Sequence, residues 1–268
     1  MFFSQAARAD NACALKEAGE IPVTFDAKTG APLVTVTAGD QSITLLLDSE
    51  APISMITPEA AERLHGRNHS TRDLSLRMKS GGQRVENYTT VKNVTVRRAT
   101  LTSADLAGPQ GVIQDRDGHI GMDILSEFDL ESDLLNAKMK IFLHVGCDKS
   151  PVYRTDSYGK IDLLDNPFNY VLFETALDGK HTARILGTAY RLTAMPRKIA
   201  GERFNIRPDA PEGACAKEVQ KGDRFGQLDI GGLSIRNPEI NSDCDHPLCP
   251  TADTIAPELE LGSITLRS

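Results

Sequence analysis

One acidic residue stands where a side chain could do chemistry. Asp48 ends the run Ile43-Thr44-Leu45-Leu46-Leu47 and is followed by Ser49 and Glu50. The strand is expected to end and turn after these aliphatic residues. The carboxylate of Asp48 is therefore expected to point away from the apolar face of the strand. A carboxylate held in this way can take a proton from water as a general base. Aspartate is also common at ordinary strand ends, so the interpretation depends on the rest of the chain.

The second half of the chain repeats this pattern without the acid. An aliphatic strand ends at Ile185-Leu186-Gly187 and is followed by Thr188. By this comparison, Gly187 takes the place of Asp48. A shift of one position would select Leu186 or Thr188 instead, and neither is acidic. The sequence therefore predicts one candidate catalytic carboxylate rather than two.

The spacing of a later glycine supports the repeat. Gly121 follows Asp48 by 73 positions, and Gly262 follows Gly187 by 75. Both late glycines come directly after an aliphatic residue. Two units of similar length and plan predict a protein of two lobes.

Strands and a short helix are expected to position Asp48. Apolar and polar residues alternate over 34–37 and again over 43–47, around Gly39-Asp40, which predicts a hairpin. Thr57-Pro58-Glu59 combines an N-cap residue, a proline at the first helical position and an acid in the first turn. A short helix is therefore expected there, ended by Gly66.

A second hairpin is expected between residues 74 and 105. The period-2 alternation returns there, and Gly81 and Gly82 are expected at the hairpin tip, where a flap over the site could lie. A short helix is expected after Gly121, followed by a strand over 139–142.

These elements predict an all-β, bilobal protein with short helices. The second half is expected to contain a strand at 173–177, the turn Asp178-Gly179 and a helix that starts at Met195-Pro196. The expected division is a signal-peptide remnant or tail over 1–12, lobe one over 13–148, a linker over 149–168 and lobe two over 169–268.

The composition excludes two classes of partner. The 268 residues carry a net charge of -7, and the pI is about 5.4. No run of Lys or Arg is dense enough to follow a phosphate backbone, so no nucleic acid is expected as a partner. No apolar stretch approaches the roughly 20 residues that span a bilayer, so no membrane span is expected.

The N-terminus and the cysteines favour export. Ala7-Arg8-Ala9 has the small-x-small pattern that precedes signal-peptide cleavage. The five cysteines are distributed more like disulfide staples than like a metal site, at Cys13, Cys147, Cys215, Cys244 and Cys249. A periplasmic or secreted protein is therefore expected, with one free thiol because five is an odd number.

Two groups of side chains have a possible interpretation as metal sites. Cys244, His246 and Cys249 lie close together in the sequence. No fourth ligand is evident, so a small-loop disulfide between the two cysteines is favoured over zinc. His65 and His69 are separated by a helix-breaking glycine and have no acid beside them, so they are interpreted as surface residues. Neither a metal nor another cofactor is expected.

The chain resembles the pepsin-like and retropepsin-like aspartic proteases, and in particular the bacterial exported members with two retropepsin-like lobes in one chain. Residues 47–51 are similar to the family signature of a hydrophobic residue, Asp, Thr or Ser, Gly and Ala. Ile120-Gly121 is similar to the second hydrophobic-Gly element, and Gly81-Gly82 to the tip of the substrate-covering flap. The resemblance covers most of residues 13–268.

The resemblance implies a fold, a reaction and a disulfide. Each lobe would be a closed β-barrel, and a cleft between the lobes would hold an extended peptide or protein by strand-like hydrogen bonds. Asp48 would activate a water molecule for peptide-bond hydrolysis, with Ser49 hydrogen-bonding nearby. The bacterial members have one Cys before the first strand and another after the closing strand of lobe one, which implies pairing of Cys13 with Cys147.

Two departures from the family pattern bear on activity. Glu50 stands where the family has a glycine, so a charged side chain is placed beside the catalytic position and at the contact between the lobes. Gly187 stands where the second Asp is expected, followed by Thr188. The family reaction is implied to need two carboxylates that share one proton, one as base and the other as acid. Activity is therefore expected to be impaired.

Two arrangements could restore a pair of carboxylates. Lobe one could pair with lobe one of a second chain, which would bring two copies of Asp48 together about a twofold axis. Alternatively, Glu50 could reach back toward Asp48, because positions two apart on an extended segment share a face. A monomer is expected rather than a dimer, because pairing would have to displace lobe two.

Two functions stay open. The first is an aspartic endopeptidase that uses Asp48. The second is a pseudoprotease that binds peptides or proteins in the same cleft without cleaving them. A longer native C-terminus is a further expectation, because lobe two stops soon after Gly262, whereas lobe one continues from Gly121 to Cys147.

Overall fold

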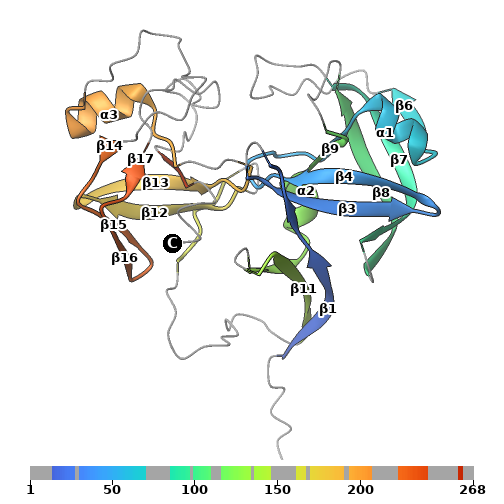
Figure 1. The fold of residues 1–268 in the computed structure, drawn as a ribbon, viewed down its shortest axis with the longest axis horizontal. Helices are drawn as coiled ribbons and strands as arrows, with labels where there is room; N and C mark the ends of the chain where they lie inside the picture. Colours follow the sequence, from blue (N-terminus) through green and yellow to red (C-terminus); the bar gives the residue numbers. More distant parts are fainter. Residues whose placement is uncertain are drawn as a thin grey trace, which may run out of the picture.

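Two lobes are present in the structure, a computed structural model, and Figure 1 shows them side by side. The structure describes residues 14–27, 30–70, 85–96, 99–109, 116–133, 136–145, 161–166, 170–189, 193–206, 223–240 and 259–261. Strands dominate both lobes and the helices are short, as the sequence predicts. The expected domain boundaries at residues 148 and 168 lie outside the described ranges and stay a prediction.

Lobe one contains a closed barrel. Its main sheet consists of β2 (Thr24–Phe25), β3 (Pro32–Ala38), β4 (Gln41–Leu47), β5 (Met55–Ile56), β6 (Arg67–Ser70), β7 (Val85–Val96), β8 (Ala99–Pro109) and β9 (Gly118–Ile120). The strand order is β2-β3-β4-β9-β5-β8-β7-β6, and β3 also pairs with β7. This additional pairing closes the ring β3-β4-β9-β5-β8-β7, so the barrel leaves no free edge among these strands.

The hairpin expected before Asp48 is confirmed as β3 and β4, which pair antiparallel over their whole length. Gly39 lies in the turn with φ of 64°, a conformation that glycine adopts without strain. The alternating aliphatic residues of both strands are buried, namely Val34, Val36, Ile43, Leu45 and Leu47. The period of two therefore sends the apolar face into the barrel and brings Asp48 to its end.

The helix α1 (Pro58–Arg63) begins where the sequence predicts. Thr57 is its N-cap residue, and its Oγ1 accepts a hydrogen bond from the Ala60 N–H at 3.1 Å. This bond satisfies one of the N–H groups that the first helical turn leaves open. The helix ends at its C-cap residue Leu64, two residues before the expected Gly66.

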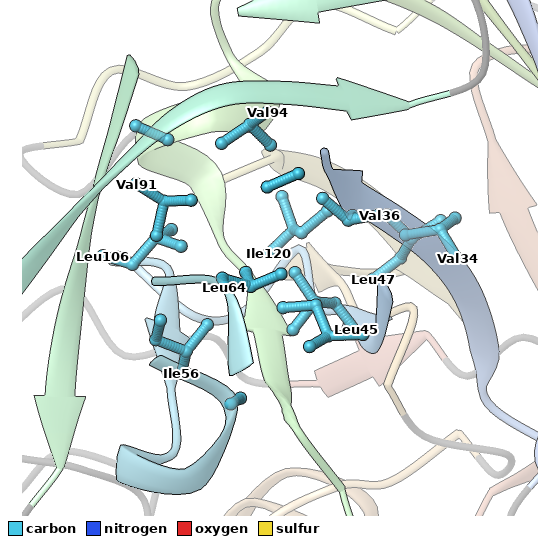
Figure 2. Close-up of a cluster of buried hydrophobic side chains, with 14 of the residues drawn as sticks. Val34, Val36, Leu45, Leu47, Ile56, Leu64, Val91, Val94, Leu106 and Ile120 are labelled. Carbon is cyan, nitrogen blue, oxygen red and sulfur yellow. The ribbon is translucent and has the colours of Figure 1, made fainter. Parts of the chain in front are cut away.

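The core of the barrel is shown in Figure 2. Buried side chains from six strands and from the end of α1 meet there, and those labelled are Val34, Val36, Leu45, Leu47, Ile56, Leu64, Val91, Val94, Leu106 and Ile120. Burial of one such side chain contributes about 1.5–3 kcal/mol relative to its exposed state. This packing fixes β4 and β9, the two strands on which the position of Asp48 depends.

A smaller sheet adjoins the barrel. It has the order β1-β11-β10, formed by β1 (Ala14–Pro22), β10 (Asp129–Asp133) and β11 (Lys138–Val145). The strand β11 contains the strand expected over 139–142. The helix α2 (Met122–Leu125) confirms the short helix expected after Gly121.

Lobe two repeats the hairpin and the helix. Its described elements are β12 (Leu172–Leu177), β13 (Lys180–Leu186), α3 (Arg197–Phe204), β14 (Asp223–Arg224), β15 (Gln227–Ile230), β16 (Leu233–Arg236), β17 (Glu239–Ile240) and β18 (Leu259–Leu261). Five strands form a sheet of order β16-β15-β12-β13-β18, and β14 pairs with β17. Within the described part of lobe two, no pairing joins β16 to β18, so the closure seen in lobe one is not repeated there.

A second core holds lobe two together. Its buried members are Phe173, Leu177, Met195, Ala200, Phe225, Leu228, Ile230 and Ile240. The segment 161–166 runs beside this lobe, because Leu163 forms a bridge with Phe173. Among the helices that the structure describes, none is long and apolar enough to cross a membrane.

Candidate functional site

Asp48 lies in a turn that backbone hydrogen bonds define. Its N–H donates to the Ile120 carbonyl of β9 at 3.0 Å, and its carbonyl accepts from the Ala51 N–H at 3.2 Å. The Oδ1 atom of Asp48 accepts a hydrogen bond from the Glu50 N–H at 3.0 Å, and Asp48 is 8% exposed. The turn therefore holds one carboxylate oxygen in a fixed direction, in surroundings largely shielded from water.

Gly121 allows β9 to lie against this turn. The strands β4 and β9 are parallel, with Leu47 opposite Ile120, and Gly121 is the next residue. A Cβ atom at Gly121 would lie 2.6 Å from the Ala51 carbonyl oxygen and 2.8 Å from the Ile53 carbonyl carbon. Both distances are shorter than van der Waals contact allows. The aliphatic-Gly element is thus needed for close approach of two backbone segments.

Ser54 and Asp123 tie the same region to α2. Ser54 Oγ donates to Asp123 Oδ1 at 2.6 Å and accepts from the Gly121 N–H at 2.9 Å. The Ser54 N–H donates to the same Asp123 oxygen at 2.8 Å. The Asp123 carboxylate therefore holds the loop at Ser54 against α2. No sequence signal marked Ser54, because its two partners are 67 and 69 positions away.

Lobe two has the same strand arrangement at Gly187. The strands β13 and β18 are parallel, with Leu186 opposite Leu261, just as β4 and β9 are parallel in lobe one. Gly187 follows Leu186 at the end of β13 as Asp48 follows Leu47 at the end of β4. The strand pairing thus makes Gly187 the counterpart of Asp48.

Ser49 and Thr188 join the two turns. The Ser49 N–H donates to Thr188 Oγ1 at 3.0 Å, and the Thr188 N–H donates to Ser49 Oγ at 3.1 Å. Ser49 Oγ also donates to the Leu186 carbonyl, and Thr188 Oγ1 donates to the Leu47 carbonyl at 2.6 Å. Each bond has its counterpart from the opposite lobe, so the contacts are related by an approximate twofold axis. The turns of Asp48 and Gly187 therefore meet where the lobes meet.

These bonds also locate the Ser49 hydroxyl, which is engaged with lobe two. Its expected hydrogen bond beside a catalytic water stays a prediction. The sequence marks Thr188 only as the residue that follows Gly187. Its bonds to Ser49 and Leu47 span 139 and 141 positions, so no local pattern could have shown them.

Glu50 extends from lobe one to Gly187. Glu50 is 3% exposed, and Gly187 is also buried. A Cβ atom at position 187 would lie 2.1 Å from Glu50 Oε1 and 2.8 Å from Glu50 Cδ. The carboxyl group of Glu50 therefore occupies the space in which a side chain at position 187 would begin.

Several expected site residues lie outside the described ranges. They are the flap residues Gly81 and Gly82, the late glycine Gly262, and the cysteines Cys13, Cys147, Cys215, Cys244 and Cys249. The flap and both expected disulfides stay predictions.

The described residues also bear on metal binding. Within them, no group of three or more His, Cys, Asp or Glu side chains is placed to hold a metal ion. Of the two histidines considered from the sequence, His69 stacks on Tyr88 with ring centroids 4.7 Å apart. This contact packs β6 against β7.

A closed barrel with an acid on a strand-end turn, next to a parallel aliphatic-Gly strand, defines a lobe of the aspartic protease type. Residues 34–124 match the family model described as aspartyl protease. The matched segment contains Asp48, its turn, β9 and the start of α2. The chain is therefore similar to the aspartyl protease family within lobe one.

One similar solved structure is that of a retropepsin-like aspartic protease from Rickettsia conorii. The likeness covers 49% of this chain and 96% of that chain, with 16% sequence identity and a TM-score of 0.36. A likeness of this size says nothing about activity. No curated protein matches the sequence.

Proposed function

We propose that this protein is an aspartic-type endopeptidase in which Asp48 activates the water that attacks the peptide bond. One observation carries the proposal: the Asp48 carboxylate is fixed by the Glu50 N–H on a turn that Ser49 and Thr188 join to lobe two. A general base works best when its position is fixed before the reaction. The similarity of residues 34–124 to the aspartyl protease family also supports peptide-bond hydrolysis.

The proposed substrate is an extended peptide or an unfolded protein segment. Such a segment would lie where the two lobes meet and form strand-like backbone hydrogen bonds. The flap expected at Gly81 and Gly82 would cover it. No cofactor enters this reaction, because Asp48 supplies the base and the nucleophile is water.

Cleavage of an unfolded protein at acidic and at neutral pH tests the proposal. The wild type is expected to cleave, and Asp48→Asn is expected to lose at least about 10²-fold in rate, as for loss of a general base. Asp40→Asn is the matched control, because Asp40 lies exposed in the turn of the same hairpin. A rate that Asp48→Asn leaves at the wild-type level would remove Asp48 from the mechanism.

A pseudoprotease is the second candidate, and Gly187 favours it. The counterpart of Asp48 has no acid of its own, and one carboxylate cannot be base and acid at once. The two functions differ in one experiment on the folded wild type. A pseudoprotease would bind an extended peptide without producing fragments, whereas an endopeptidase would release fragments.

The site of action is proposed to be the periplasm or the cell exterior. The Ala7-Arg8-Ala9 pattern and the five cysteines support this location. Cell fractionation with mass determination of the N-terminus tests it. A chain found in the cytoplasm with an uncleaved N-terminus would contradict it.

A further inference from the structure

We infer that Glu50 is the second catalytic carboxylate of this site and acts in place of an acid at position 187. The inference rests on the proposed endopeptidase function and names a further residue of its machinery. It also accounts for two departures from the family signature by one structural cause.

The first step is the location of the Glu50 side chain. The Cβ position at residue 187 lies 2.1 Å from Glu50 Oε1, 2.8 Å from Cδ and 3.5 Å from Cγ. The strand register makes Gly187 the counterpart of Asp48. Glu50 therefore brings a carboxyl group from lobe one to the place in lobe two where a partner of Asp48 would be anchored.

The second step is that Glu50 and Gly187 depend on each other. A side chain at position 187 would require the Glu50 carboxyl group to leave the position it has in the structure. Lobe one therefore supplies both acids, Asp48 and Glu50, and lobe two supplies the small residue that leaves room for the Glu50 carboxyl group.

The third step concerns how the two acids are held. The Glu50 N–H donates to Asp48 Oδ1 at 3.0 Å, so the residues share one turn. Both are more than nine-tenths buried. In general, two neighbouring carboxyl groups that are shielded from water share one proton, and the inference assigns this arrangement to Asp48 and Glu50.

Other titratable side chains on the neighbouring elements have partners of their own. Asp123 of α2 accepts from Ser54, and His119 Nε2 of β9 lies 2.9 Å from the Ile53 carbonyl oxygen. Arg184 of β13 donates through Nε to Thr175. Asp48 and Glu50 lie on the turn that the hydrogen bonds between Ser49 and Thr188 join to lobe two.

The pair supplies a balanced hydrolysis. The ionised carboxyl group takes one proton from water as the water oxygen bonds to the scissile carbonyl carbon, and the protonated group gives its proton to the carbonyl oxygen. The resulting gem-diol collapses as the C–N bond breaks. The amine nitrogen takes the proton that came from water, and a gem-diol hydroxyl returns a proton to the other carboxylate. One proton is left on the pair, as at the start.

Cleavage of an unfolded protein by Glu50→Gln tests the inference. Glu59→Gln, an exposed position in the first turn of α1, is the control and should keep the wild-type rate.

Cleavage assays on the same variants separate this inference from the proposed function. Glu50→Gln is expected to lower kcat by about 10²- to 10⁴-fold. Wild-type cleavage by Glu50→Gln, together with an inactive Asp48→Asn, would overturn the role of Glu50 and leave the endopeptidase proposal standing. A folded wild type that cleaves nothing would overturn both the endopeptidase proposal and the catalytic role of Glu50.

A double variant keeps the inference testable if Glu50→Gln fails to fold. Glu50→Gly combined with Gly187→Asp places the acid in lobe two and removes the Glu50 side chain that occupies this space. This double variant is expected to recover part of the activity that Glu50→Gly alone loses, with circular dichroism as the check of folding. Full activity of Glu50→Gly alone would overturn the inference.

Discussion

Ser49 and Thr188 exchange hydrogen bonds in both directions across the contact between the lobes. Each N–H donates to the hydroxyl oxygen of the other residue, at 3.0 and 3.1 Å. Each hydroxyl also donates to the carbonyl of the residue just before the opposite turn, Leu186 or Leu47. Ser49 directly follows Asp48, and Thr188 directly follows Gly187. These hydrogen bonds therefore fix the positions of Asp48 and Gly187 relative to each other.

Thr188→Val is therefore expected to loosen the site. Valine keeps the shape of threonine but leaves the Ser49 N–H and the Leu47 carbonyl without their partner, at a cost of about 1–3 kcal/mol in the free energy of unfolding. Denaturant unfolding and cleavage rate measure the effect. Thr35→Val, on the exposed face of β3, is the control. Equal behaviour of the two variants would show that the Thr188 hydroxyl does not hold the lobes.

Gly187→Ala is expected to affect activity more than stability. The added Cβ meets Glu50 Oε1 at 2.1 Å, and this oxygen is the end of a flexible side chain that can move aside. Displacement of a catalytic group by about 1 Å can cost about 10²-fold in rate. The cleavage rate and the free energy of unfolding are both measured. The rate is expected to fall clearly, whereas the free energy of unfolding is expected to change little.

Gly201→Ala in α3 is the matched control for Gly187→Ala. The nearest atom to a Cβ at position 201 is the Ile206 carbonyl oxygen at 3.7 Å, an ordinary van der Waals distance. It should retain full activity. An unchanged rate in Gly187→Ala would mean that the position of the Glu50 carboxyl group does not matter for catalysis.

Gly121→Ala is expected to behave in the opposite way, with a large loss of stability. Here the added Cβ meets backbone atoms of Ala51 and Ile53, at 2.6 and 2.8 Å, and these cannot move without shifting the turn. Overpacking of this kind costs about 1–3 kcal/mol or more. Gly19→Ala in β1, which has open space within 4 Å, is the control in the same denaturant experiment. Similar midpoints for both variants would contradict the close approach.

A surface acid provides a test of the hydrogen bonding in lobe two. The Ser234 hydroxyl donates to Asp229 and, with the Gln227 amide, holds the pKa of that carboxyl below its usual range. A lowered pKa in the folded state contributes stability above the pKa of the unfolded state, and this contribution is lost as the pH falls through the folded pKa.

Ser234→Ala should therefore raise the pKa of Asp229 toward its ordinary value. Titration of the Asp229 carboxyl group by NMR measures the change. A pKa that stays equally low in Ser234→Ala would assign the effect to Gln227 alone.

Local patterns were sufficient to predict the elements that carry Asp48. The alternation in β3 and β4, the Thr57-Pro58 start of α1 and the aliphatic-Gly pair at the end of β9 each depend on residues close in sequence. The same holds for the hairpin of β12 and β13. These elements appear in the structure where the sequence predicts them.

The contacts between the lobes could not be predicted in the same way. The sequence marks Glu50 as a departure from the family signature, and the spacing of two residues points to Asp48 as its possible partner. Its contact with Gly187 joins positions far apart in the chain, so only a structure could show that the two departures fill one space. The hydrogen bonds between Ser49 and Thr188 also join distant positions, so the sequence does not predict them.

The pH dependence of kcat/KM for cleavage of an extended peptide tests the account most directly. Two carboxyl groups that share a proton predict a bell-shaped profile, with one limb for the base and one for the acid, and the loss of this profile in Asp48→Asn. A folded wild type without cleavage at any pH, or an unchanged bell-shaped profile in Asp48→Asn, would contradict it.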